Sequence, residues 1–226
     1  IHALINRIYG TTQESVLSSL RNFFRKKIET KEGAVDYTIK SNTFSFNELL
    51  KIELPARKSF YITEDEIEGF LSFSKGIESF FALSLLYPNL RYKEVQFHQD
   101  HIHPAALFND DTFDSLGIPE EQRQEWLNKK NLLPNLQLME GRQNESKNSK
   151  EFKIWLKTMD KSQQKHFFQS NYIPQKFDYS FSNFESFFEK RKEMLRKALL
   201  KVFAINNDIP KDASLLSEEP NENGGI

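Results

Sequence analysis

The stretch Phe97-His98-Gln99-Asp100-His101-Ile102-His103-Pro104 decides the fold that the sequence predicts, because it places three of the five histidines beside a carboxylate. The run before it, Tyr92 to Phe97, is strand-like, so we expect a short β-strand that delivers the histidine cluster. Pro104 lacks the N–H that a strand ladder needs and should end the pairing. Neighbouring residues on a strand point to opposite faces, so Asp100 and His101 need a turn to face one cleft.

A second polar segment, Asn135 to Lys147, follows further along the chain. Leu132 to Met139 predicts a second strand, and Asn144 to Leu156 has the apolar spacing of a helix. Residues 105–130 predict a loop followed by a helix near Pro119 to Lys130. We therefore expect two strands that are separated by a long insertion and followed by a helix.

Helical periodicity dominates the rest of the chain. Three capping boxes predict helix starts, at Thr11–Glu14, Thr63–Glu66 and Ser182–Glu185. Their helices should extend to about residues 28, 86 and 204, and Gly76 should bend or break the second one. Another helix should run to about Gln169, and alternating Val35, Tyr37 and Ile39 predict a strand or hairpin within residues 31–60.

The expected fold is therefore mainly α with a small α+β core. We expect a helical region over residues 1–90 and the core with its insertion over residues 91–150. C-terminal helices that pack on the core should span residues 151–205. Residues 206–226 are polar and acidic, which predicts a disordered tail.

The composition limits the function classes. The 226 residues include no cysteine, which excludes disulfides, thiolate zinc sites and cysteine nucleophiles. A net charge of −1 means that nucleic-acid binding would need a local basic patch. No apolar run approaches the roughly 18 residues of a membrane span, and no secretory signal is visible. Together these features favour a cytoplasmic protein without a membrane partner, and a start at Ile1 suggests part of a longer chain.

The residue types in the two polar segments fit phosphodiester hydrolysis. Asp100 offers a hard oxygen, which Mg²⁺ prefers, and Asn144 could offer another. His101 can take a proton from water at neutral pH, and an amide or carbonyl around Asn135 could orient its ring. Lys147, one helical turn after Asn144, could meet a phosphate oxygen.

A family resemblance rests on the same residues. Asp100-His101-Ile102-His103-Pro104, then Asn135-Leu136-Gln137-Leu138, then Asn144-Glu145-Ser146-Lys147 resemble the HNH motif of ββα-metal nucleases. The resemblance implies that Asp100 and Asn144 hold one Mg²⁺ or Mn²⁺ ion and that His101 is the general base. It also implies that Asn135 steadies the hairpin loop and this base. The gap between His101 and Asn135 is longer than in compact family members, so we interpret residues 105–130 as an insertion.

Upstream segments extend the resemblance to a class of large bacterial defence proteins. These segments are Phe60-Tyr61-Ile62-Thr63, Ser74-Lys75-Gly76 and Leu83 to Asn89. In GmrSD-type modification-dependent restriction enzymes and phosphorothioate-sensing nickases, a ParB-like N-terminal domain precedes the HNH domain. The resemblance thus implies a DNA endonuclease of anti-phage defence in the bacterial cytoplasm. Its ParB-like partner domain lies outside the present sequence.

Four more residues are candidates for contact with the substrate or its phosphates: Lys147, Arg142, His98 and His103. His98 can instead support the strand, His103 can pack internally, and Arg142 can be solvated. Two other functions also stay open. The chain can be a catalytically weak or inactive HNH module that binds DNA or docks a partner domain, or it can be a nuclease directed at RNA.

Overall fold

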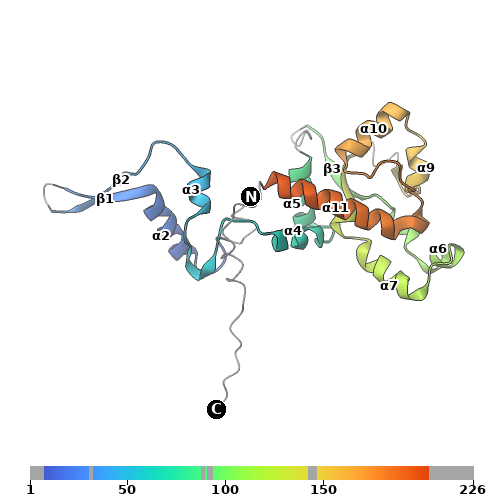
Figure 1. Ribbon diagram of the computed structural model, residues 1–226, viewed down its shortest axis with the longest axis horizontal. Coiled ribbons are helices and arrows are strands. Elements are labelled where there is room, and N and C mark those ends of the chain that lie inside the picture. Colours follow the sequence, from blue (N-terminus) through green and yellow to red (C-terminus); the bar gives the residue numbers. More distant parts are fainter. Residues whose placement is uncertain (1–7, 31–32, 88–89, 91–93, 142–146, 204–226) are drawn as a thin grey trace, which may run out of the picture. The chain divides into compact units, whose positions relative to one another are not determined.

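The structure is a computed structural model, and it describes residues 8–30, 33–87, 90, 94–141 and 147–203. The chain divides into two compact units (Figure 1). Unit 1 comprises residues 1–63 with residues 205–226, and unit 2 comprises residues 64–204. The fold is mainly helical, with two small antiparallel sheets of two strands each. The predicted fold class is confirmed at this coarse level.

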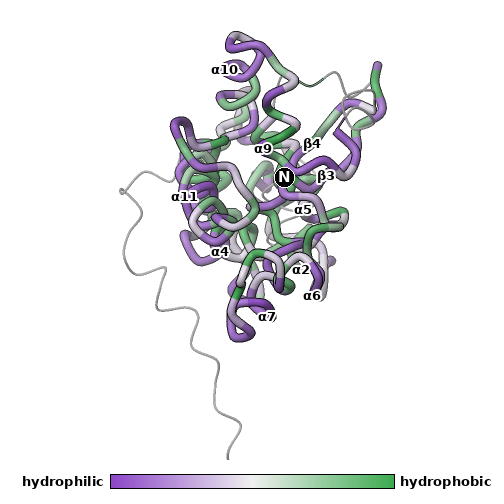
Figure 2. The backbone as a smooth tube through the Cα atoms, turned by 90° about the vertical axis from the view of Figure 1, so that its right-hand side faces the viewer, coloured by the Kyte–Doolittle hydropathy of each residue, from purple (hydrophilic) through white to green (hydrophobic). Residues whose placement is uncertain are grey.

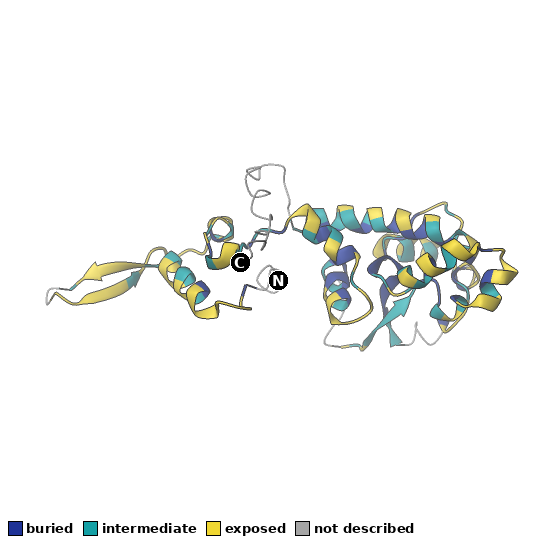
Figure 3. Ribbon diagram, turned by 90° about the horizontal axis from the view of Figure 1, so that it is seen from below, coloured by how far each residue is buried: buried dark blue, intermediate teal, exposed yellow. Residues whose placement is uncertain are grey.

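Unit 1 contains α2 (Gln13–Phe24), the hairpin of β1 (Arg25–Glu29) and β2 (Val35–Ile39), α3 (Phe46–Leu50) and the 3₁₀ turn η1 (Pro55–Arg57). Its small core joins five buried side chains: Ile8, Val16, Leu49, Leu54 and Phe60. The predicted strand at Val35–Ile39 is confirmed. The predicted helix to residue 28 is wrong, because the chain becomes extended at Arg25 and pairs with β2. Figure 3 shows most of this hairpin exposed.

Unit 2 begins with α4 (Glu64–Leu71) and α5 (Ile77–Leu86). Gly76 precedes α5, so the predicted break at this glycine is confirmed. The long helix α11 (Phe184–Val202) packs against both α4 and α5. Its hydrophilic and hydrophobic residues alternate along the helix (Figure 2), and its buried residues are Phe184, Phe187, Phe188, Arg191, Leu195 and Leu199. This packing gives unit 2 its helical frame.

The second sheet is the hairpin of β3 (Phe97–His101) and β4 (Leu136–Glu140). His98 and His101 therefore lie within the first strand and His103 follows it, so the pairing ends before Pro104 as predicted. The insertion between the strands holds η2 (Ala105–Leu107), α6 (Asp110–Ser115), α7 (Glu120–Lys129) and η3 (Leu133–Asn135). The predicted helix near Pro119 to Lys130 is confirmed as α7. An aromatic cluster that includes Phe113, Trp126 and Phe184 packs the insertion on α11.

The hairpin is followed by α9 (Phe152–Leu156), α10 (Lys161–Ser170) and the 3₁₀ turn η4 (Phe181–Asn183). The predicted continuous helix from Asn144 to Leu156 is wrong. Asn148 has a left-handed φ of 46°, and residues 148–151 are not helical. The helix predicted to end near Gln169 is confirmed as α10. Together with the hairpin and α11, these elements enclose a core that includes Ile102, Met139 and Phe152.

The helix caps differ from those predicted. Thr12 precedes α2 with a left-handed φ of 65° and no side-chain cap bond, and Asn183 before α11 likewise makes none. The first and third capping boxes are therefore wrong, although both helices exist. A capping box that the sequence analysis missed joins Asp160 and Gln163 at α10. Among the described helices, none is long and apolar enough to cross a bilayer. The predicted tail, residues 206–226, lies outside the described residues.

Candidate functional site

The β3–β4 register sorts the predicted site residues onto two faces. Asp100 lies opposite Gln137, and His98 lies opposite Met139. His101 lies opposite Leu136. Residues directly across an antiparallel pair share a face, and that face alternates along each strand. Asp100 and His101 therefore point to opposite sides of the hairpin, and no turn brings them to one side.

Asp100 is held by two side chains from the second half of the hairpin region. The Lys147 ammonium lies 2.8 Å from its Oδ2 atom, and the Gln137 amide donates to the same oxygen at 3.0 Å. Lys147 also donates to the His101 carbonyl, so it joins the strand end to the segment after β4. The Asp100 side chain keeps 14% exposure, whereas that of Lys147 is 1% exposed.

This burial corrects the prediction that Lys147 meets a phosphate oxygen. Its ammonium is enclosed and faces Asp100, not solvent. Burial lowers the pKa of Lys147, while the Asp100 carboxylate opposes that shift. The pair leaves one carboxylate oxygen, Oδ1, without a bond to Lys147. Lys147 thus fixes the Asp100 side chain and the backbone at His101.

His101 is oriented by an amide that the sequence analysis did not single out. Its Nε2 atom lies 2.9 Å from Asn131 Oδ1. An amide oxygen only accepts, so the imidazole proton lies on Nε2 and Nδ1 keeps the lone pair that a general base needs. Burial lowers the pKa of His101, the Asn131 bond opposes this, and Lys75 lowers the pKa further. The ring is therefore neutral at neutral pH.

Lys75 is a second residue that the sequence analysis missed as a site candidate. Its backbone N–H donates to the Asn131 carbonyl at 2.8 Å, and the preceding Ser74 forms a bridge with Leu132. Asn131 therefore joins His101 through its side chain and Lys75 through its main chain. The Lys75 side chain is exposed, so it offers a solvent-facing cation beside the imidazole. Neither Lys75 nor Asn131 stands out in periodicity, because both lie in turns outside the helices.

Asn135 is completely buried and acts on the backbone. Its Oδ1 atom accepts from the His103 N–H at 2.9 Å. Its Nδ2 atom donates to the carbonyls of His103 at 3.1 Å and Lys130 at 2.8 Å. The Asn135 carbonyl also accepts from the Ile102 N–H. The Asn135 amide thus links the backbone that follows β3 to the segment that precedes β4. The bond that orients the His101 ring comes from Asn131 instead.

His103 does not face solvent, so the predicted contact with phosphate is wrong. The residue is fully buried, and four phenylalanine rings, Phe152, Phe181, Phe184 and Phe187, lie 4.8–6.0 Å from its ring. Neither ring nitrogen has a hydrogen-bond partner within the described structure. Burial, with a smaller effect from Lys147, lowers the pKa of His103 to about 3. The ring is a neutral part of the core.

Of the remaining predicted site residues, the structure describes His98 but neither Arg142 nor Asn144. His98 is half-buried on the Asp100 face, and its Nε2 atom is 3.7 Å from the point that a Cβ on Gly141 would occupy. Asn144 and Arg142 lie outside the described residues. The described part of the chain contains no group of three or more histidine, aspartate or glutamate side chains that could hold a metal ion.

The described donors nevertheless match a hard cation in kind. Asp100 supplies a carboxylate, and the buried Gln137 Oε1 atom has no hydrogen-bond partner within the described structure. Both residues lie on the same face in directly opposed positions. Carboxylate and amide oxygens suit Mg²⁺, which also keeps several of its waters. Two oxygen donors of the kind that Mg²⁺ binds therefore lie on one face of the hairpin, and the Lys147 ammonium is bound to Asp100 Oδ2.

Comparison with known proteins adds no family assignment. The chain matches no protein-family model, and no curated protein matches it. The functional conclusion therefore depends on the residues of the hairpin and on their contacts.

Proposed function

We propose that unit 2 is a metal-dependent endonuclease of the HNH type that hydrolyses phosphodiester bonds in DNA. The supporting observation is the β3–β4 hairpin, which brings Asp100, His101 and Asn135 together although a long insertion separates them in sequence. Because Asp100 and His101 point to opposite sides of the hairpin, the scissile phosphate would lie at the strand end at His101, within reach of both side chains. Lys147, which follows β4, closes the group by binding Asp100. In the HNH motif these residue types stand in the same order and on the same kind of hairpin.

In the proposed mechanism His101 is the general base. Asn131 holds the proton on Nε2, so Nδ1 accepts a proton from the attacking water. The lowered pKa keeps the imidazole neutral and ready at neutral pH. A general base of this kind contributes typically 10²–10⁴-fold to the rate.

Two lysines have different tasks in this mechanism: Lys75 contacts the phosphate, and Lys147 positions Asp100. Lys75 is solvent-facing and neutralises a non-bridging phosphate oxygen, the role that the sequence analysis gave to Lys147. Lys147 fixes the Asp100 carboxylate and the His101 carbonyl. Asp100, Gln137 and Asn144 would hold the Mg²⁺ or Mn²⁺ ion. When bound, such an ion stabilises the charge that develops on phosphate and leaving oxygen.

The biological setting belongs to the same proposal. An HNH nuclease that resembles the C-terminal half of GmrSD-type and phosphorothioate-sensing enzymes acts on phage DNA in the bacterial cytoplasm. Its partner is a ParB-like N-terminal domain of the same longer protein. The support for this setting is the sequence resemblance over residues 60–160.

Cleavage of supercoiled plasmid tests the proposal. We expect Mg²⁺-dependent nicking or linearisation that EDTA abolishes and that His101→Ala reduces by at least about 100-fold. Asp100→Asn should raise the Mg²⁺ concentration needed for half-maximal cleavage. Lys157→Ala, an exposed lysine after α9, is the matched control and should cleave normally. Unchanged cleavage by His101→Ala would sink the mechanism, and parallel digestion of RNA decides between the two substrates.

One observation favours a second candidate function. The Lys147 ammonium already satisfies Asp100 Oδ2, so the hairpin is stable without a metal ion and suits a catalytically inactive module that binds DNA or docks a partner domain. Such a module binds plasmid but leaves it intact at every Mg²⁺ or Mn²⁺ concentration. Its affinity falls steeply with salt if phosphate contacts dominate.

A further inference from the structure

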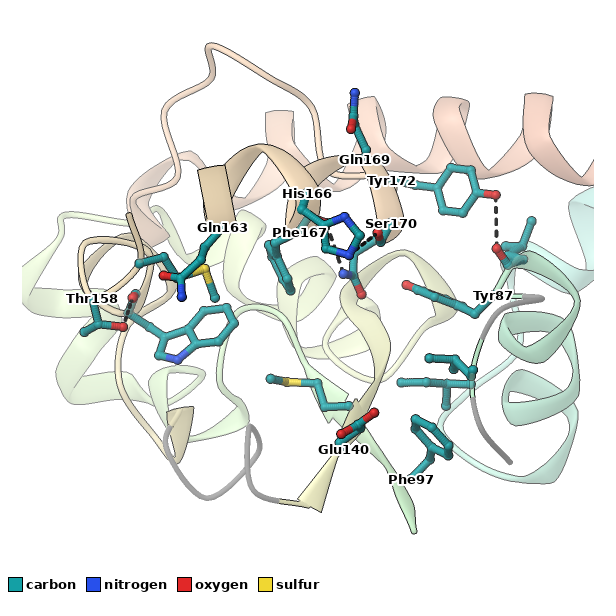
Figure 4. Close-up of a pocket in the computed structure, with 17 residues that line it drawn as sticks. Tyr87, Phe97, Glu140, Thr158, Gln163, His166, Phe167, Gln169, Ser170 and Tyr172 are labelled. Carbon is teal, nitrogen blue, oxygen red and sulfur yellow. Dashed lines mark hydrogen bonds between the residues drawn. The ribbon is translucent and has the colours of Figure 1, made fainter. Parts of the chain in front are cut away.

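A cavity of about 820 Å³ lies in unit 2 between the end of the β3–β4 hairpin and α10. Its size lies within the range of small-molecule sites. Figure 4 shows Glu140 and Phe97 on the hairpin side, and His166, Phe167 and Ser170 on the side of α10. None of the residues placed in the proposed nuclease chemistry lines this cavity.

Aromatic rings line the cavity from two sides. Trp155 and Phe167 form one pair, with ring centroids 5.1 Å apart. Tyr87 and Tyr172 form the other, with centroids 6.2 Å apart, and both reach the cavity near the end of α5 (Figure 4). Rings on two sides of one space offer stacking faces to a flat ligand.

The polar lining indicates what kind of flat ligand fits. Gln163, His166 and Asn171 bring amide and imidazole groups to the cavity, which can both donate and accept hydrogen bonds. Among the described residues that line it there is no lysine or arginine, and Glu140 supplies a carboxylate. This lining disfavours a phosphate and suits an uncharged heteroaromatic ring with hydrogen-bonding edges.

A direct line of contacts joins the cavity to Asp100. The Gln137 amide donates to Asp100 Oδ2 at 3.0 Å, and the same Nε2 atom lies 3.1 Å from the Met139 sulfur. Met139 lines the cavity. Two residues along a strand span roughly 7 Å, so the cavity opens close to the proposed cleavage site.

We propose that this cavity binds an unstacked nucleobase of the strand whose backbone lies at Asp100 and His101. The inference rests on the proposed function, because it supplies the base-binding part of that site. Proteins that bind single strands commonly stack bases on aromatic side chains, whichever base is present. The nuclease would therefore act on a strand with at least one base removed from the duplex stack.

The test measures binding without cleavage. A fluorescently labelled single-stranded DNA octamer and an octamer of the same length with abasic sugars throughout are titrated with the protein in EDTA. Fluorescence anisotropy should show the base-bearing strand bound at least about tenfold more tightly. Because no cation lines the cavity, this ratio should stay constant as salt rises, while both affinities fall. Equal affinities for the two strands would overturn the inference.

Variants locate the effect in the cavity. Tyr172→Leu removes a stacking face, and Ser170→Leu fills the space from an exposed position on α10. Both should lower the ratio of affinities towards one. Ser162→Leu, an exposed serine of the same helix outside the lining, should leave it unchanged. If Tyr172→Leu does not fold, Ser170→Leu still decides, and a ratio that survives Ser170→Leu counts against the cavity.

The outcome is separable from that of the nuclease proposal. A protein that prefers the base-bearing strand in EDTA but never cuts DNA or RNA with Mg²⁺ upholds the base site and overturns the nuclease. A protein that cuts plasmid but binds both octamers equally upholds the nuclease and overturns the base site.

Discussion

Three ionisable side chains of unit 2 are fully buried in different ways: His103, Lys147 and Arg191. Lys147 has the Asp100 carboxylate as its partner. Arg191 has no carboxylate among its described partners and instead donates to backbone carbonyls and to the Tyr87 hydroxyl. The His103 ring lies among four phenylalanine rings, and its nitrogens have no hydrogen-bond partner within the described structure. Burial of polar groups without full pairing costs stability, so each residue makes a separate prediction.

His103 should make the protein sensitive to acid. Its pKa is about 3 in the folded protein and near 6.5 in the unfolded chain, so the unfolded chain binds more protons between these values. The stability that His103 contributes is present above pH 6.5 and is lost as the pH falls towards 3. At about 1.36 kcal/mol for each pH unit, the loss reaches about 2 kcal/mol at pH 5.

His103→Leu is the matching variant, because an apolar side chain of similar size leaves no unpaired nitrogen in the core. Its free energy of unfolding at pH 7 should lie within about 1 kcal/mol of the wild-type value. Urea unfolding at pH 7 and pH 5 measures both proteins. A wild-type loss between these pH values no larger than that of the variant would contradict the burial of a neutral ring.

Lys147→Met should destabilise the protein strongly, because Asp100 is left as a partly buried carboxylate without its cation. Removing one member of a buried pair costs about 3–5 kcal/mol. The double variant Lys147→Met with Asp100→Asn should recover part of that loss, which a double-mutant cycle of urea unfolding quantifies. Additive losses would show that the pair contributes no coupling.

At the scale of elements, the side-chain amide of Asn135 holds the backbone that follows β3. Asn135→Ala removes the three side-chain bonds to His103 and Lys130 and leaves buried backbone groups unpaired, at a cost of about 3 kcal/mol. Asn131→Ala is the matched control, because Asn131 is exposed and its side chain orients His101. It should change stability by less than about 0.5 kcal/mol. Thermal unfolding and plasmid cleavage separate the two effects.

The sequence predicted elements better than it predicted side-chain surroundings. Gly76, α7 and α11 follow from periodicity and breakers, which are local signals. The end of α2 at Phe24 was missed because Arg25–Glu29 pairs with a strand that lies beyond a turn, and the sequence carries no local sign of that choice. Lys147 was misjudged because its partners, Asp100 and the His101 carbonyl, lie on a strand far before it in the sequence. The choice between packing and phosphate contact for His103 stayed open because the rings around it come from α9, η4 and α11.

Residue spacing predicted only some of the residues of the candidate site. The order of Asp100, His101, Asn135 and Lys147 indicated residues that the hairpin does bring near one another. Asn131 and Lys75 were missed, because their link to His101 exists only after the segment around Ser74 pairs with Leu132. Gln137 can be derived once both strand ends are known, since it lies directly opposite Asp100.

At the scale of the whole molecule, each of the three hydrophobic clusters described above lies within one unit. The core of unit 1 draws only on residues 8–60, and both clusters around the hairpin and its insertion draw only on unit 2. Side chains with a shared core unfold together, whereas separate cores can unfold independently. Unit 2 therefore contains everything that the described part of the candidate site needs.

A fragment of residues 64–204 should fold by itself and retain the activity of the longer chain. Both tryptophans of the sequence, Trp126 and Trp155, lie in this unit, so tryptophan fluorescence reports its unfolding alone. The thermal midpoints of the fragment and of the full chain should agree within about 3 °C, which corresponds to less than 1 kcal/mol for a domain of this size. A much lower midpoint in the fragment would show that unit 1 stabilises unit 2.

Arg191 sets an order of events during synthesis. Its guanidinium holds the carbonyls of Pro134 and Asn171, and Pro134 lies just before the strand that carries Gln137. On a ribosome the hairpin emerges well before α11, since chains are made from the N-terminus. Until Arg191 is synthesised, the Pro134 carbonyl lacks this donor. Two of the four phenylalanine rings around His103, which belong to α11, are also not yet all in place. The hairpin of a nascent chain therefore gains its full set of contacts only after α11 has docked.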